Sequence, residues 1–126
     1  MIPKDLRYTD QHTWLRPAGD TARFGVTEAA VAELGELVYI ELPEVGASFS
    51  KGQSFGVIES TKAVYDLLSP VSGKVVALNQ ATADDPDVVA GDPFGKGWMI
   101  ELSLSDPSEV DALMSPEDYA KKVEAD

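Results

Sequence analysis

Cysteine is absent from this sequence of 126 residues, and histidine occurs once, at His12. Without cysteine the fold cannot be held by disulfides, and no thiolate is available as a nucleophile. A single histidine with no nucleophile motif near it is poorly suited to acid–base catalysis, so we predict a structural role for His12. Any redox chemistry must therefore come from a bound group, and we expect a protein that is not an enzyme.

Positive charge is also scarce in this chain. The sequence has 10 Lys and Arg against 22 Asp and Glu, which gives a net charge of −12. Proteins that bind phosphate backbones need clustered Lys and Arg, so the composition argues against nucleic acid as a partner. An acidic surface favours solubility, and it can also steer a protein toward basic docking patches on its partners.

Long hydrophobic runs are missing as well. The longest apolar runs have four or five residues, whereas a membrane helix needs about 20. Residues 1–5 lead directly into polar sequence, with no secretory leader. We therefore expect a cytoplasmic protein that does not enter a membrane, although a mitochondrial protein that has lost its presequence would begin in the same way.

The chain is long enough for one domain with a single core, expected to span residues 1–126. Short β-branched and aromatic runs, bounded by Gly, Pro, Asn or Ser, are its main signal. They predict strands at residues 22–26, 37–40, 55–58, 75–78 and 98–102. Strands punctuated in this way are typical of a sandwich or a flattened barrel.

Helix signals are few. Thr27 can cap a short helix over residues 28–34, which Gly35 would end. Two later segments, beginning at Asp106 and Ser115, each place a capping residue before a proline and an acid. They predict a helical tail over about residues 106–126 that packs two apolar stripes against the sheet, one of Val110, Leu113 and Met114 and one of Tyr119 and Val123.

The sequence also repeats itself weakly. Residues 35–40 are similar to residues 73–78, which lie 38 positions later. Further similar pairs follow in the same order, residues 51–56 with 90–95 and residues 57–59 with 99–101. Three matches in constant order predict two similar β-halves related by a pseudo-two-fold and linked by residues 60–72.

Lys62 stands between these two halves. The strand before it ends at Glu59 and the next begins near Val64, so Lys62 is predicted at or beside the tip of a hairpin. There its amine would be held in water on two rigid strands. From position alone, the usual interpretation of such a lysine is a solvated surface charge. Pro70 and Gly73 predict a second tight turn after the hairpin.

Residues 55–63, followed by Asp66 and by residues 69–75, resemble the lipoyl-attachment region of glycine cleavage system H proteins. The resemblance covers nearly the whole chain and includes residues 8–14, 25–27, 34–36, 41–46 and 92–98 and the tail after Pro107. It implies a mostly β, lipoyl/biotinyl-like flattened barrel. Such a fold is a sandwich of antiparallel sheets, here with a short internal helix and C-terminal helices.

The resemblance implies that Lys62 carries lipoate as N6-lipoyllysine, which supplies the redox group that the cysteine-free chain lacks. It implies that Glu59 and Asp66 help a lipoate ligase, a lipoyl transferase or other partners to recognise the site. The other implied partners are a pyridoxal-phosphate glycine decarboxylase, a tetrahydrofolate-dependent aminomethyltransferase and the FAD enzyme dihydrolipoamide dehydrogenase. The carrier is expected to be a monomer without catalytic residues or a metal.

Four positions depart from the family, at Thr13, Ala29, Val31 and Ala90, and the first two bear on its arm pocket. H proteins usually carry an acid where Thr13 stands, and a histidine or an aromatic residue where Ala29 stands. In the family, that acid, that histidine and the aspartate matching Asp66 help to form a pocket that shelters a cationic aminomethyl arm. Because a carboxylate stabilises a nearby amine, these departures predict a weaker shelter in this chain.

The weaker shelter leaves a second interpretation open, in which an H-like lipoyl carrier serves a heterodisulfide-reductase-like sulfur-oxidation complex. A biotin carrier is a further alternative. Those proteins place Met on both sides of the lysine, however, whereas Thr61 and Ala63 flank Lys62. We therefore expect a lipoyl carrier, with glycine cleavage as the leading pathway.

Overall fold

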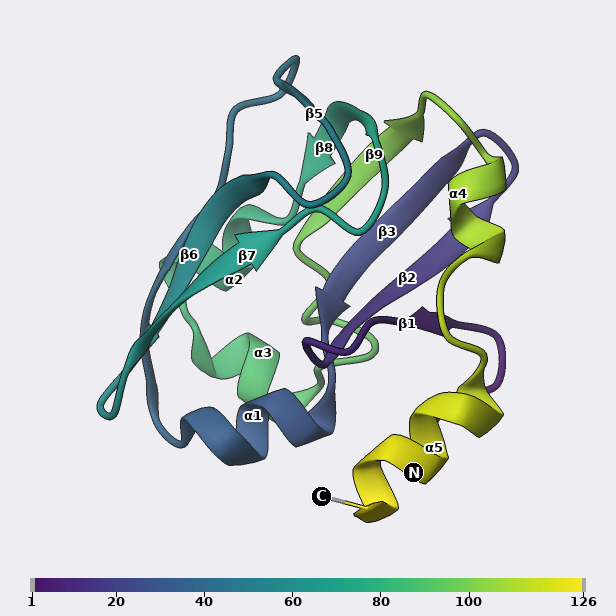
Figure 1. The fold of residues 1–126 in the computed structure, drawn as a ribbon. Helices are drawn as coiled ribbons and strands as arrows, with labels where there is room; N and C mark the ends of the chain where they lie inside the picture. The colour runs from purple at the N-terminus through teal and green to yellow at the C-terminus, as the bar shows by residue number, and fades with distance from the viewer. Residues whose placement is uncertain (1, 126) are drawn as a thin grey trace.

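The computed structural model describes residues 2–125 as two antiparallel sheets with short helices at their ends (Figure 1). The larger sheet has six strands in the order β1-β2-β3-β9-β8-β5, and the smaller has three in the order β4-β6-β7. The predicted sandwich of antiparallel sheets is therefore confirmed. Met1 and Asp126, the ends of the expected domain, lie outside the described residues.

The elements follow one another along the chain with short connections. The strands are β1 (Arg7–Tyr8), β2 (Thr13–Ala18), β3 (Thr21–Val26), β4 (Leu37–Glu41), β5 (Ser48–Phe49), β6 (Ser54–Ser60), β7 (Val64–Leu68), β8 (Gly73–Leu78) and β9 (Ile100–Leu104). The helices are α1 (Glu28–Leu34), α2 (Gln80–Asp84), α3 (Asp87–Gly91), α4 (Ser108–Asp111) and α5 (Pro116–Ala125).

Helix α1 begins and ends where the sequence predicts. The hydroxyl of Thr27 accepts from the N–H of Ala30 at 3.3 Å, which satisfies one of the free donors at the start of the helix. Gly35 ends the helix with a φ of 76°, a conformation that glycine adopts at little cost. The predicted helical tail is likewise confirmed as α4 and α5.

Four of the five predicted strand runs lie inside strands of the structure, namely β3, β4, β6 and β8. The fifth begins two residues later than predicted, because β9 starts at Ile100 and leaves Trp98 outside the ladder. The elements that the sequence analysis did not predict are β1, β2, β5, α2 and α3.

Two strand pairs confirm most of the predicted repeat. In the smaller sheet, β4 pairs with β6 so that Ile40 faces Ile58, and in the larger sheet β8 pairs with β9 so that Leu78 faces Ile100. The sequence repeat matches Ile40 with Leu78 and Ile58 with Ile100. Both strand pairs also have a register irregularity at matching positions, after Leu37 in β4 and after Val75 in β8. The remaining match is not structural, because residues 51–56 lead into β6 whereas residues 90–95 end α3 and form a turn.

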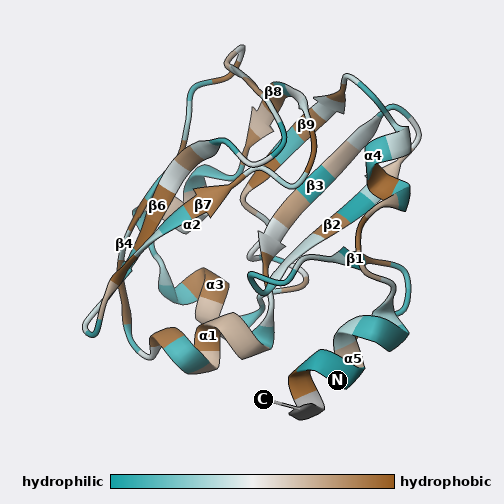
Figure 2. Cartoon of the chain, in the orientation of Figure 1, coloured by the Kyte–Doolittle hydropathy of each residue, from teal (hydrophilic) through white to brown (hydrophobic). Residues whose placement is uncertain are grey.

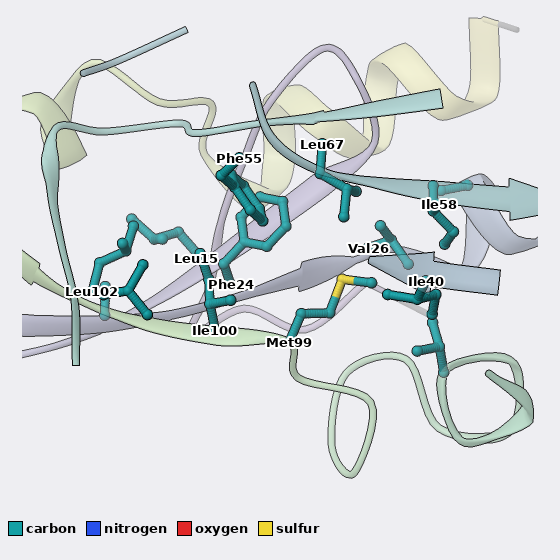
Figure 3. Packing of buried hydrophobic residues seen from close by; sticks show 14 of the residues in the cluster. Leu15, Phe24, Val26, Ile40, Phe55, Ile58, Leu67, Met99, Ile100 and Leu102 are labelled. Atoms are coloured by element: carbon teal, nitrogen blue, oxygen red, sulfur yellow. The ribbon is translucent and has the colours of Figure 1, made fainter. Parts of the chain in front are cut away.

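The main core lies between the two sheets (Figure 3). Phe24 of the larger sheet meets Phe55 of the smaller one edge to face, with ring centroids 5.0 Å apart. Such a pair stabilises the fold by about 1 kcal/mol beyond the area that the two rings bury. Ile58 and Leu67 extend the core toward α1, so the two strands that lead to Lys62 are anchored in it.

A second, smaller core fixes α5 to the larger sheet. Tyr119 of α5 stacks on Tyr8 with ring centroids 4.5 Å apart, and both side chains are buried with Leu6 and Trp14. Figure 2 shows that the rest of α5 is mainly hydrophilic. Both predicted stripes of the tail are therefore packed: Tyr119 and Val123 belong to this smaller core, which Met114 also contacts, while Val110 and Leu113 join the main core.

Candidate functional site

Lys62 lies in the turn that joins β6 to β7, at the end of the hairpin that projects from the smaller sheet (Figure 1). Ser60 closes this turn, because its N–H donates to the carbonyl of Ala63 at 2.8 Å. The side chain of Ser60 is buried, and its hydroxyl accepts from the N–H groups of Lys62 at 3.1 Å and Ala63 at 3.2 Å. A serine that bonds the backbone in this way stabilises a tight turn. The predicted position of Lys62 at a hairpin tip is confirmed.

The tip is also tied to the segment that follows α1. The N–H of Thr61 donates to the carbonyl of Glu36 at 3.0 Å. A Cβ atom added to Gly35 would lie 3.5 Å from Cε of Lys62, so the methylene stem of the lysine runs beside this glycine. The lysine as a whole remains exposed. The fold therefore presents a primary amine to solvent on a turn whose backbone is hydrogen-bonded both within the turn and to Glu36.

Glu59 and Asp66 lie on the same face of the smaller sheet. Glu59 is opposite Val64 on β7, and Asp66 is opposite Val57 on β6. Residues paired across an antiparallel ladder share a face, as do residues two apart along a strand. The neighbouring Ile58 points into the core, so these four residues form the outward face. This face combines two acidic residues with the exposed side chain of Val64, close to Lys62.

A pocket of about 110 Å³ lies between α1, the start of β2 and the edge strand β7. We call it the α1–β7 pocket, and its walls include Thr13, Ala30, Glu33, Tyr65, Asp66 and Leu67. A volume of about 110 Å³ is enough to hold a small polar group. The structure thus brings Thr13 and Asp66 to one pocket, as the family resemblance implies.

Ala29 lies elsewhere, and the interpretation that it removes a group from the arm pocket is wrong. It lines a different hollow of about 340 Å³, together with Phe94 and Tyr119. Successive residues of an α-helix point about 100° apart. Ala29 and Ala30 therefore border different hollows on neighbouring flanks of α1.

Glu33 is a wall of the α1–β7 pocket that the sequence analysis missed. It follows Ala30 by three positions and directly precedes Leu34, and both of these residues also line the pocket. Residues three or four apart share a helix face, so this spacing is the signal that the sequence contains. Glu33 and Asp66 are thus two acidic residues among those that line the pocket, whereas Thr13 is uncharged.

His12 connects Glu33 to the C-terminal helix. Its Nε2 lies 4.0 Å from Oε2 of Glu33, and its Nδ1 lies 2.7 Å from the hydroxyl of Tyr119. That hydroxyl is also 2.7 Å from Oγ1 of Thr27, the cap of α1. The backbone of His12 has a φ of 61°, which is uncommon outside glycine, and its carbonyl accepts from the N–H of Thr27 at 3.0 Å. These contacts agree with the structural role predicted for His12.

A larger hollow of about 390 Å³ lies farther from the tip, beyond Leu68, and is lined by Lys51, Pro70 and Met114 among others. Among residues 2–125, no group of three or more His, Asp or Glu side chains could hold a metal ion. Over the same part of the chain, none of the helices is long and apolar enough to cross a membrane.

Comparison with known proteins gives consistent matches over nearly the full chain. The family described as glycine cleavage H-protein matches residues 6–126. A glycine cleavage system H protein of Carboxydothermus hydrogenoformans is 49% identical over 124 residues, which cover 98% of this chain and 95% of that protein. A probable glycine cleavage system H protein of Haloarcula marismortui is 48% identical over 123 residues, covering 98% and 97%. The crystal structure of a glycine cleavage system H protein from Mycobacterium marinum matches with a TM-score of 0.90 and 42% identity, covering 96% of this chain and 98% of that one.

Proposed function

This chain belongs to the glycine cleavage H-protein family, and on that premise we propose that it is a carrier that holds lipoate on Lys62 and serves glycine cleavage. The proposal depends above all on one observation, the exposed amine of Lys62 at a hairpin tip whose backbone is bonded within the turn and to Glu36. The protein then acts as a carrier and its partner enzymes perform the chemistry. We expect it to work as a monomer in the cytoplasm.

The residues at the tip fit a covalently attached acyl group. A primary amine in solvent can be acylated by a ligase or a transferase, and the resulting amide carries no charge. Lipoate attached in this way supplies a cyclic disulfide, which is the redox group that the cysteine-free chain lacks. Gly35 leaves the stem of Lys62 unobstructed, since even an added Cβ would stay 3.5 Å from Cε. The chain's own contribution is to hold the anchor still while the arm moves.

The α1–β7 pocket lies within reach of such an arm. A lysine side chain extended by lipoate is about 14 Å long. Asp66 is four residues along β7 from Lys62, which is about 13 Å at the usual rise of a strand. The hollow beyond Leu68 begins about 20 Å from Lys62 on the same basis, which is out of reach. The pocket lined by Glu33 and Asp66 is therefore the hollow that the loaded end of the arm could reach between visits to partner enzymes.

Glu59 and Asp66 are proposed to serve recognition by partner proteins. They stand on the outward face of the hairpin, where a docking enzyme would approach Lys62. The net charge of −12 favours partners with basic docking patches, because complementary charge accelerates encounter. The partners proposed are a lipoate ligase or lipoyl transferase, glycine decarboxylase, the aminomethyltransferase and dihydrolipoamide dehydrogenase. Tethering the arm raises its effective concentration at each of their active sites.

No feature of the described residues favours the sulfur-oxidation alternative. That alternative depended on a weakened arm pocket, with a loss at Thr13 and another at Ala29. Two acidic residues, Glu33 and Asp66, still line the pocket, and Ala29 is not among its lining residues. The reason for preferring a different pathway is therefore largely removed.

The attachment is tested by co-expression with a lipoate ligase in the presence of lipoate. The intact protein should gain the mass of one lipoyl group, located on the peptide that contains Lys62. K62R keeps the positive charge but cannot form the amide, so labelling should vanish while the circular dichroism spectrum is unchanged. K74R, at another exposed lysine, is the matched control and should be labelled normally.

The pathway is tested separately with the lipoylated protein. Incubation with glycine decarboxylase should support exchange of labelled bicarbonate into the carboxyl group of glycine, and K62R should not. Labelling that persists in K62R would overturn the attachment site. Full lipoylation of Lys62 without any exchange would retain the carrier but overturn glycine cleavage as its pathway.

A further inference from the structure

We propose that the hollow lined by Ala29, called here the α1–α5 hollow, is a docking site for the arm on Lys62 when the end of that arm is the uncharged, closed disulfide ring of lipoate. The inference rests on the proposed function in one respect, since Lys62 must carry lipoate. The hollow has a volume of about 340 Å³ and borders a different flank of α1 from the α1–β7 pocket. Helix α1 thus offers the arm a resting place that requires no charge at its end.

The first step of the argument concerns the walls of the hollow. Most of its described walls are apolar side chains from the N-terminal segment, the two helices and the turn after α3, namely Ile2, Ala29, Ala32, Phe94 and Val123. Glu28 is a charged wall, but it is exposed at the first turn of α1, so its carboxylate stays in solvent. A ring of carbon and sulfur gains free energy when apolar walls replace the water around it, whereas a charged end would give up its hydration.

The second step concerns size and the aromatic lining. A volume of about 340 Å³ lies within the range of about 300–1,000 Å³ that is usual for sites of small organic molecules. Phe94 and Tyr119 both line the hollow, and sulfur makes favourable contacts with aromatic rings. The hydroxyl of Tyr119 is engaged with His12 and Thr27, so this wall presents a ring that is fixed in place.

The third step concerns the direction in which the arm leaves the hairpin tip. A Cβ atom added to Gly35 would lie 3.5 Å from Cε and 3.8 Å from Nζ of Lys62, so the end of the lysine stem runs beside Gly35. Ala32 precedes Gly35 by three residues, which places the two about 60° apart around the helix axis. Leu34, a wall of the α1–β7 pocket, is about 100° from Gly35. The stem of Lys62 therefore lies closer to the flank of α1 that borders the α1–α5 hollow.

The fourth step concerns length. Figure 1 shows α1 between the hairpin tip and α5. At a rise of about 1.5 Å per residue, Ala32 is about 4.5 Å and Ala29 about 9 Å from Gly35 along the helix axis. A lipoyl group extends roughly 8 Å beyond Nζ, so its ring reaches the wall that these two alanines form. Ordering the flexible arm costs about as much free energy as burying the ring gains, so docked and free arms coexist.

The test compares the intact protein without lipoate, with the oxidised arm, and with an arm that carries two negative charges. A water-soluble phosphine reduces the disulfide to two thiols and becomes the phosphine oxide, taking its oxygen from water. Iodoacetate then forms a carbon–sulfur bond at each thiol, with loss of iodide and a proton. Because the chain has no cysteine, the thiols alkylated are those of the arm. Docking is followed by NMR from the methyl signals of Ala29 and Ala32.

The oxidised arm should shift both methyl signals relative to the protein without lipoate, and the carboxymethylated arm should not. A29L places a larger apolar side chain in the hollow from a half-buried position, so it should largely abolish the shift at Ala32, measured against its own form without lipoate. A81L is the matched control, because Ala81 is an exposed alanine of α2 that is not among the lining residues of the hollow. It should leave the shift unchanged.

The rate at which the phosphine reduces the arm gives an independent readout. A docked fraction of about one half to three quarters protects the disulfide to that extent, so reduction should be about two- to fourfold faster in A29L than in the unaltered protein or A81L. Equal reduction rates, or an equal shift at Ala32 in A29L and the unaltered protein, would overturn the docking site. A protein whose Lys62 gains no lipoyl mass would refute the carrier proposal and this inference with it, whereas lipoylation without a shift at Ala29 would refute only this inference.

Discussion

Replacing Tyr119 by phenylalanine should destabilise the protein by removing one hydroxyl from a buried network. Tyr119 is 1% exposed, and its hydroxyl lies 2.7 Å from Nδ1 of His12 and 2.7 Å from Oγ1 of Thr27. The ring of Phe can keep the stack on Tyr8, so the loss is confined to the hydroxyl. Each of the two hydrogen bonds contributes about 1 kcal/mol, and partners left without one add to the cost. The expected loss is about 2–3 kcal/mol.

This loss should be measured by thermal and urea unfolding. For a domain of this size, 1 kcal/mol corresponds to about 3–5 °C in Tm, so Y119F should melt roughly 6–15 °C lower. The urea midpoint should fall while the slope m stays the same, since the surface exposed on unfolding is unchanged. Y39F is the control, because Tyr39 is 48% exposed on the outward face of the smaller sheet. A shift in Y119F no larger than that in Y39F would refute the argument that the hydroxyl network fixes α5 to α1.

Three further predictions follow from individual residues. Burial raises the pKa of the Tyr8 phenol, with the charge of Asp5 adding to the effect. As the pH rises, the unfolded chain would therefore lose this proton before the folded protein does. The free energy of unfolding should then fall above about pH 10, by up to about 1.4 kcal/mol per pH unit. Y8F should remove that dependence in urea titrations at high pH. G35A and G52A should each cost about 1–2 kcal/mol by urea unfolding, because both glycines have positive φ; an unchanged urea midpoint in either variant would contradict the strain argument. Lipoylation of Lys62 should change the free energy of unfolding by less than about 1 kcal/mol, and a larger rise in Tm would mean that the unloaded arm is itself buried.

The elements predicted correctly from the sequence are those whose signals are local. Helix α1 follows from the cap at Thr27 and the glycine at position 35, and both act within one turn of the helix. The hairpin tip at Lys62 follows from two β-branched runs with a short polar break between them. In each case the residues that set the conformation are neighbours in sequence, so no knowledge of the rest of the fold was needed.

The elements that were missed depend on the tertiary structure. Pro17 argues against a central strand, yet it lies in β2 opposite Ala22. The conflict disappears because the neighbouring β1 pairs only with Trp14 and Leu15, which leaves Pro17 on an open edge where no donor is required. Helices α2 and α3 have five residues each and no side-chain cap, so they carry almost no sequence signal.

The composition of the pocket could not be predicted for a similar reason. Helical spacing groups Ala30, Glu33 and Leu34 on one face, but it does not say that this face meets β7. The family resemblance directed attention to position 29, which lies on the other flank of the same helix. The wrong assignment of Ala29 and the omission of Glu33 thus have one cause, since the sequence does not show how α1 is rotated about its own axis relative to the sheet.

The matched pairs β4–β6 and β8–β9 have a mechanical consequence for an arm that partners pull on. Each pair has a third strand beside it, β7 next to β6 and β3 next to β9, but only β6 continues directly into its neighbour. At the corresponding end of β9 the chain departs toward α4. A load applied there would fall on the single strand β9, which is paired with β3 on one side and β8 on the other. At Lys62 the same load divides between the two paired strands of one hairpin, each of which is anchored in the core, β6 by Ile58 and β7 by Leu67.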